Sequence, residues 1–224
     1  MRAESGRNVS AAYRSRRDEE IPSFSAGQEE FAQRMAEVSE RESWRRAERR
    51  RLIAHRLALA PEERQRCAAA IGKNLTELLA KLSGATVGFY WPIRGEFDPL
   101  PVAERFGKAG RVIALPAAIA PDAALEYRPW RAGDAMEAGR HSIPEPRERR
   151  LVQPDILVVP LVGFDQGRHR LGYGGGYFDR TLAALSPRPV TIGVGYEAAL
   201  LPTIYPQAHD VALDFIVTEA QLRP

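Results

Sequence analysis

The sequence holds few of the residues on which several classes of protein depend. Cys67 is the single cysteine among 224 residues, so an intramolecular disulfide and a cysteine-based zinc cluster are both excluded. No apolar run approaches the roughly 20 residues that cross a bilayer, and the N-terminus has no apolar signal region. We therefore expect a protein of the reducing cytoplasm, with no membrane partner and with one hydrophobic core.

Lysine is scarce as well, and arginine supplies nearly all of the positive charge. The formal net charge is only +3, which is weak evidence for a nucleic-acid partner. Arginine favours fixed, bidentate contacts with phosphate groups. We expect no nucleic acid to bind, and a monomer or a weak homo-oligomer.

The order of apolar and helical patterns indicates the fold class. Residues 1–26 mix Arg, Glu, Ser and Gly without apolar periodicity, which predicts a disordered extension before a domain at residues 27–224. Strands that alternate with helices predict a single α/β domain with a mostly parallel sheet flanked by helices. The expected helices are 28–59, 61–82, 99–108 and 177–185, the expected strands are 85–91, 111–117, 125–130, 156–162, 190–196 and 214–218, and 131–150 is expected to be a surface loop.

One stretch, DILVVPLVGFDQGRHRLGYGGGYFDR at residues 155–180, carries the strongest chemical signal. A buried strand is followed by four glycines in five positions and then by a helix start. Glycines let backbone N–H groups approach an anion, and a helix N-terminus adds positive potential. Arg168 and Arg170 could close over phosphates that Asp179 bridges through magnesium. A simple tight turn fits equally well, because GxGGG is neither the dinucleotide fingerprint nor the Walker loop.

The whole string is more specific than the glycine pattern. RLGYGGGYFDR, preceded by VPLVGFD, closely resembles the signature of the 5-formyltetrahydrofolate cyclo-ligase (5,10-methenyltetrahydrofolate synthetase) family. YWPIRGEFDPL and HDVALDFIVTE support the resemblance, which covers roughly residues 44–219. It implies a NagB/RpiA/CoA-transferase-like fold and an enzyme that closes 5-formyltetrahydrofolate to 5,10-methenyltetrahydrofolate with ATP and Mg²⁺, releasing ADP and phosphate. Phe178 stands where tyrosine is common in the family.

The resemblance also implies which residues form the site. ATP would be held by Arg45, Arg49, Arg170, Leu171, Gly172, Tyr173, Gly174, Gly175, Gly176, Tyr177 and Phe178. The folate would contact Trp91, Glu96 and the loop residues Tyr173, Gly174, Gly175, Gly176 and Tyr177. Magnesium would bind Asp179 and Asp210, and Arg170 and Tyr177 would be catalytic.

Plainer interpretations stay open for several of these residues. Spacing alone favours a solvated basic face for Arg45 and Arg49, core packing for Trp91 and an ordinary loop carboxylate for Glu96. Three other functions also remain. The chain could be a same-fold paralogue without cyclo-ligase activity, linked to thiamine metabolism. It could be a relative of sugar-phosphate isomerases and CoA-transferases, or a non-enzymatic RNA-binding protein that uses the arginine-rich helix at residues 41–56.

Overall fold

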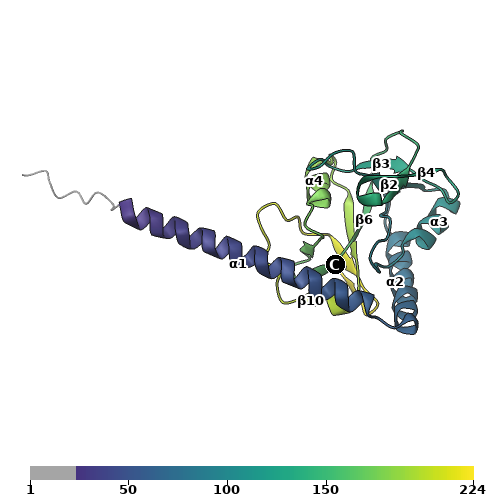
Figure 1. Ribbon diagram of the computed structural model, residues 1–224. Coiled ribbons are helices and arrows are strands. Elements are labelled where there is room, and N and C mark those ends of the chain that lie inside the picture. The colour runs from purple at the N-terminus through teal and green to yellow at the C-terminus, as the bar shows by residue number, and fades with distance from the viewer. Residues whose placement is uncertain (1–23) are drawn as a thin grey trace, which may run out of the picture. The chain divides into compact units, whose positions relative to one another are not determined.

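A computed structural model describes the backbone of residues 24–224 (Figure 1). The extension predicted for residues 1–26 lies outside the described residues, apart from the last three, which begin helix α1 (Phe24–Leu57). The chain divides after Ser43, and the second compact unit is Trp44–Pro224. That unit starts where the family resemblance starts, and the predicted domain start at residue 27 stays a prediction. Among the described residues, no helix is both long and apolar enough to cross a membrane.

The second unit is built on a seven-stranded sheet of order β12-β11-β9-β6-β1-β2-β3. The five inner strands pair in parallel, and an antiparallel strand closes each edge. The predicted α/β fold with a mostly parallel sheet is therefore confirmed. The strands are β1 (Thr86–Gly88), β2 (Val112–Ala117), β3 (Glu126–Pro129), β6 (Ile156–Pro160), β9 (Val190–Val194), β11 (Phe215–Val217) and β12 (Leu222–Arg223).

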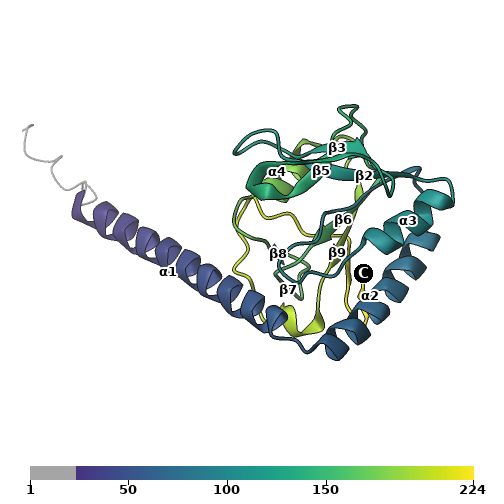
Figure 2. The ribbon, with the colours of Figure 1, turned by 45° about the vertical axis from the view of Figure 1, so that its right-hand side comes forward.

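Helices cover both faces of this sheet, as the apolar run of β6 requires, since every residue of that strand is buried. Helices α2 (Pro61–Lys81) and α3 (Leu100–Lys108) pack into one core cluster. Leu52 of α1 and Leu182 of α4 (Tyr177–Ala184) belong to the other cluster (Figure 2). The buried positions of α2 are those predicted from helical spacing, namely Cys67, Ile71, Leu75, Leu78 and Leu79.

Two small sheets lie outside the central one. Strands β7 (Gly163–Asp165), β8 (Arg170–Leu171) and β10 (Leu200–Leu201) form a three-stranded sheet, and β9 is followed by the short helix η2 (Glu197–Ala199). Strands β4 (Met136–Ala138) and β5 (Pro144–Pro146) pair around helix η1 (Arg140–Ser142). The segment 131–150, predicted to be a surface loop, therefore contains a short hairpin that the prediction lacked. Arg128, which is 1% exposed, holds this hairpin through Glu145 and the Pro146 carbonyl.

Candidate functional site

The glycine-rich segment forms a loop, defined here as Gly172–Gly176, between β8 and α4. The predicted glycine loop and the helix after it are present, but the unpredicted strand β8, rather than the buried strand at 156–162, leads directly into the loop. Gly174 and Gly176 have φ values of +96° and +64°, which residues with a Cβ rarely adopt. At Gly172 a Cβ would lie 2.6 Å from Nη1 of Arg170. Gly174 and Gly176 are thus needed for their backbone conformation, and Gly172 leaves room for the Arg170 side chain.

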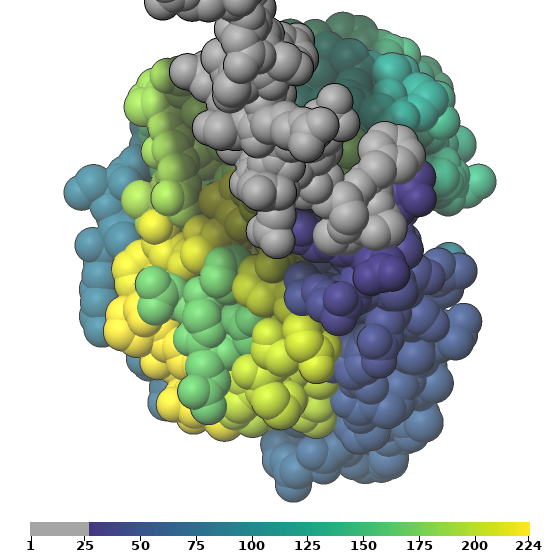
Figure 3. All heavy atoms as spheres, turned by 90° about the vertical axis from the view of Figure 1, so that its left-hand side faces the viewer, coloured from purple at the N-terminus to yellow at the C-terminus, as the bar shows by residue number. Residues whose placement is uncertain are grey.

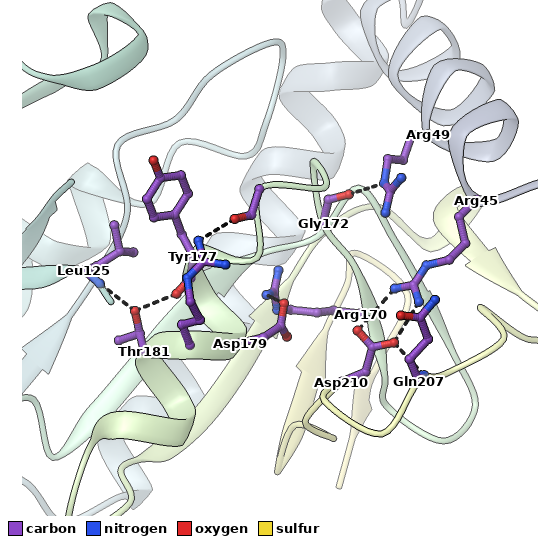
Figure 4. A network of polar contacts seen from close by, with 12 residues as sticks. Arg45, Arg49, Leu125, Arg170, Gly172, Tyr177, Asp179, Thr181, Gln207 and Asp210 are labelled. Carbon is purple, nitrogen blue, oxygen red and sulfur yellow. Dashed lines mark hydrogen bonds and ion pairs between the residues drawn. The ribbon is translucent and has the colours of Figure 1, made fainter. Parts of the chain in front are cut away.

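The C-terminal part of α1 brings two arginines to this loop (Figure 4). Arg49 donates from Nε to the Gly172 carbonyl at 2.7 Å. Arg45 is 6% exposed and donates from both Nη atoms to the Asp210 carboxylate, at 2.8 Å and 3.2 Å. The interpretation of these two residues as a solvated basic face is therefore wrong. Trp44, the first residue of the second unit, packs edge-on to Tyr205 with ring centroids 4.9 Å apart. Figure 3 shows the yellow-green segment after β10 beside the purple-blue end of α1.

Arg170 comes from β8 and lies beneath the loop. It is buried, donates to Oδ2 of Asp179 at 2.7 Å, and its guanidinium lies 5.2 Å from the Phe178 ring centroid. Burial lowers the pKa of Arg170, against the opposing effect of Asp179. Burial, and then the charge of Arg45, also lower the pKa of Arg49. The arginines around the loop therefore repel one another in a poorly solvated place, and an anion bound there would relieve that repulsion.

The two aspartates predicted to bind magnesium differ in how well they fit that role. Oδ1 of Asp179 is buried and has no hydrogen-bond partner, which leaves it free to coordinate a cation. Both oxygens of Asp210 are engaged, by Arg45 and by the backbone N–H of Gln207. The described residues include no group of three or more His, Cys, Asp or Glu side chains that could hold a metal. A magnesium ion that keeps several waters and uses substrate phosphates fits Asp179, and it fits Asp210 only if Arg45 turns to another anion.

Glu96, predicted to contact folate, lies against the same loop. The residue is 9% exposed, and its Oε1 accepts a hydrogen bond from the Tyr173 hydroxyl at 2.8 Å. Burial raises the pKa of Glu96, and hydrogen bonds from Ile93 N–H and Tyr173 act in the opposite direction. Trp91 is half-buried and packs on the core, in agreement with the plainer interpretation. The glycine loop, predicted to bind ATP, and the segment of Glu96, predicted to bind folate, are therefore joined by the hydrogen bond between Tyr173 and Glu96.

Two predicted side chains are not brought to the centre. The Tyr177 ring points away from Arg170 and Asp179 (Figure 4), and the Arg180 guanidinium covers it at 5.2 Å. Arg168 donates to the backbone carbonyls of Leu213 and Pro224, so its suggested contact with phosphate is not supported.

Sequence reasoning missed Arg56, which is 5% exposed and hydrogen-bonds to Tyr173. A signal was present, because Arg45, Arg49 and Arg56 are spaced four and seven residues apart on one helix face. It also missed Asp165, whose buried carboxylate accepts hydrogen bonds from the backbone N–H groups of His169 and Ile204 and so holds the turn between β7 and β8.

Comparison with known proteins identifies the class and the family of the chain. The fold and the named relatives are those of an enzyme of the ligase class. The chain belongs to the 5-formyltetrahydrofolate cyclo-ligase family, whose model matches residues 41–219.

Named relatives match over most of their length. The chain is 29% identical over 178 residues to the 5-formyltetrahydrofolate cyclo-ligase of Escherichia coli (strain K12), covering 75% of this chain and 96% of that one. The corresponding protein of Mycolicibacterium smegmatis is 31% identical over 147 residues, covering 62% and 75%. The solved structure of Aquifex aeolicus 5,10-methenyltetrahydrofolate synthetase superimposes with a TM-score of 0.69 at 28% identity, covering 80% of this chain and 91% of that one.

Proposed function

We propose that this protein closes 5-formyltetrahydrofolate to 5,10-methenyltetrahydrofolate in a reaction that requires ATP and Mg²⁺ and releases ADP and phosphate. The observation that carries the proposal is the family match over residues 41–219. The position of Arg45, Arg49 and Arg170 around the glycine loop supports it, because this arrangement suits a polyphosphate.

In this proposal the nucleotide lies along the glycine loop. Arg45, Arg49 and Arg170 contact its phosphates, and backbone N–H groups from Leu171 to Phe178 supply further donors. The first N–H groups of α4 have no partner within the helix, so a phosphate near Tyr177 would satisfy them. We therefore assign Tyr177 a backbone contact, because its ring points away from Arg170.

The folate is placed on the other side of Tyr173. The carboxylate of Glu96 is an acceptor that suits the adjacent N–H donors of an aminopyrimidine ring. Its low exposure makes such a bond stronger than it would be in water. Trp91 offers an aromatic surface for the pterin ring, and the loop from Tyr173 to Tyr177 lies between the two ligands.

The chemistry follows from the poor reactivity of a formamide. The formyl oxygen attacks the γ-phosphorus of ATP, ADP leaves, and an imidoyl phosphate is formed. N10 then attacks the activated carbon, the C–O bond breaks, phosphate leaves with the electron pair, and N10 loses its proton to solvent. No covalent nucleophile is needed, so the protein positions both substrates and neutralises charge, with Arg170 as the principal cation. Bound magnesium would offset phosphate charge, with Asp179 as the better-placed carboxylate.

A direct assay tests this proposal. Purified protein is mixed with 5-formyltetrahydrofolate, ATP and Mg²⁺, and the near-ultraviolet absorbance of the methenyl product is followed. Product that requires both ATP and metal is the expected result. If no product forms while ATP still binds, the chain is a repurposed paralogue. If neither product nor ATP binding is seen, the role of the glycine loop is wrong.

A further inference from the structure

Arg56 is a buried arginine that the proposed chemistry does not use. It lies in the last turn of α1, where the helix dipole favours a cation. Its guanidinium donates to the Arg94 carbonyl at 3.0 Å, the Leu161 carbonyl at 3.2 Å and the Tyr173 hydroxyl at 2.6 Å. The end of α1, the turn at Arg94 and the stretch from Leu161 to Tyr173 therefore meet at one side chain.

The hydrogen bonds through Tyr173 have a fixed direction. A guanidinium has donors only, so the Tyr173 oxygen accepts from Arg56. The single hydroxyl proton must then be donated to Oε1 of Glu96, at 2.8 Å. Burial, and then the charge of Glu96, raise the pKa of Tyr173, so the hydroxyl stays protonated and remains a donor. A hydroxyl that accepts from a cation is a stronger donor, so Arg56 strengthens the bond that holds Glu96.

The turn that carries Glu96 depends on groups outside it. Arg94 and Gly95 have φ values of +49° and +74°, and a residue with a side chain keeps such a value only when its surroundings hold it. Arg56 holds the Arg94 carbonyl, and the Tyr196 hydroxyl donates to the Gly95 carbonyl at 3.2 Å. Within the turn, Oε2 of Glu96 accepts from Ile93 N–H at 2.9 Å. The end of α1 thus helps to hold both the backbone of this turn, at the Arg94 carbonyl, and, through Tyr173, the carboxylate of Glu96.

We propose that Arg56 is a positioning residue which, through the Tyr173 hydroxyl, makes the Glu96 turn and the glycine loop a single unit, so that nucleotide and folate bind cooperatively. The identity of the two ligands rests on the proposed function. Tyr173 belongs to the loop assigned to ATP, and its proton goes to the carboxylate assigned to folate. Any shift of the loop caused by one ligand therefore changes the site of the other, and this coupling is reciprocal.

The first test needs no ligand. The charged and titratable side chains that face Glu96 are Arg56, Arg94, Tyr173 and Tyr90. Carbon-13 NMR of labelled glutamate carboxyls, with E96Q for assignment, measures the pKa of Glu96. Y173F and R56Q should each raise it by about one unit. Y173F removes the hydrogen bond to the charged form, whereas R56Q weakens that bond and also removes a nearby positive charge, so Y173F is the variant that isolates the role of Tyr173. We call the hydrogen bonds from Arg56 to Tyr173 and from Tyr173 to Glu96 the relay. Y173F removes only one oxygen from a half-buried side chain, so it tests the relay even if R56Q does not fold.

Arg64 provides a matched control. It donates to the carbonyls of Arg56, Leu57 and Leu59 at the same end of α1 without contacting Tyr173 or Glu96 by a hydrogen bond. R64Q should lower the melting temperature and leave the pKa of Glu96 unchanged. If Y173F and R56Q also leave that pKa unchanged, the relay does not exist.

The second test measures how strongly bound nucleotide changes the affinity for folate. The dissociation constant of 5-formyltetrahydrofolate is determined with and without a non-hydrolysable ATP analogue plus Mg²⁺. In the wild type the nucleotide should tighten folate binding by about tenfold. In Y173F and in R56Q this factor should fall to near one, and the double variant should be no worse than either single variant. Undiminished coupling in Y173F overturns the proposal. A wild type that binds no 5-formyltetrahydrofolate overturns the proposed function and the coupling with it, while the carboxyl titration still decides whether the relay exists.

Discussion

Arg45 and Asp210 are 165 residues apart in the sequence and form a two-pronged ion pair, with Nη1 to Oδ2 at 2.8 Å and Nη2 to Oδ1 at 3.2 Å. Their side chains are 8% and 5% exposed. The pair joins α1 to the segment before β11, and it satisfies two groups that the proposed function assigns to ATP and to magnesium. Arrival of the nucleotide would therefore exchange one partner of Arg45 for another, which costs less than desolvating a free guanidinium.

The Arg45–Asp210 pair should make stability depend on pH. Burial of Asp210 disfavours its charge, but hydrogen bonds from Arg45 and Gln207 N–H outweigh that effect, so its pKa lies below the ordinary 3.8. A carboxyl with a lowered pKa stabilises the fold above its unfolded-state value, and the stabilisation is lost as pH falls through the folded-state value. We expect D210N to cost about 2 kcal/mol at neutral pH. The difference from the wild type should shrink below about pH 4, as urea unfolding at several pH values would show. A constant difference down to pH 3 would contradict the role of this pair.

Arg170 should be required for turnover. R170A removes a buried cation beside the glycine loop and leaves Asp179 without its partner, so we expect a fall in kcat of about 100-fold or more. R170K keeps the charge but not the planar fork, and should recover part of the activity. Steady-state kinetics with varied ATP would measure both effects. R168A is the matched control, because Arg168 binds only backbone carbonyls and its loss should reduce stability alone. Full turnover of R170A with unchanged ATP dependence would refute the phosphate role.

The backbone conformation of the glycine loop should affect ATP binding even where the loop has room for a Cβ atom. At Gly174 a Cβ would lie 3.5 Å from Arg49, an ordinary contact, so the strain in G174A comes from its φ of +96°. We expect the KM for ATP to rise at least tenfold, at a stability cost of about 1–2 kcal/mol. G110A has a similar φ of +98° with nothing within 4 Å, and should show the stability cost without the change in KM. Equal kinetic effects of the two substitutions would argue against a nucleotide at this loop.

The two aspartates should respond unequally to metal. Asp179 has a free, buried oxygen, whereas both oxygens of Asp210 are engaged. Removing metal with a chelator should abolish product formation, and adding Mg²⁺ should restore it. D179N should raise the Mg²⁺ concentration for half-maximal rate more than D210N does. Titration of the initial rate with Mg²⁺ at saturating ATP measures this, and a larger shift for D210N would reverse the assignment.

Local sequence patterns predicted the regular elements well. Helical spacing identified the buried face of α2, and the apolar run at 156–162 identified the central strand β6. The hairpin β4–β5 was missed because its strands have little alternation and depend on Arg128, a residue of β3. The three-stranded sheet of β7, β8 and β10 was missed because strands of two or three residues leave little periodicity to detect.

The candidate site also has a part that local sequence predicts and a part that only tertiary contacts decide. The sequence alone determined the glycine loop, the helix that follows it and the family, because these depend on residues adjacent in the chain. Only the tertiary structure decided that Arg45 pairs with Asp210 and that Arg56 reaches Glu96 through Tyr173. Hydrogen bonds between distant segments depend on where the fold places each side chain and on how far burial removes it from water. The spacing of residues along the chain predicts neither the position of a side chain in the fold nor its burial. The sequence pattern of an arginine on a charged helix is therefore the same whether the side chain faces solvent or the core.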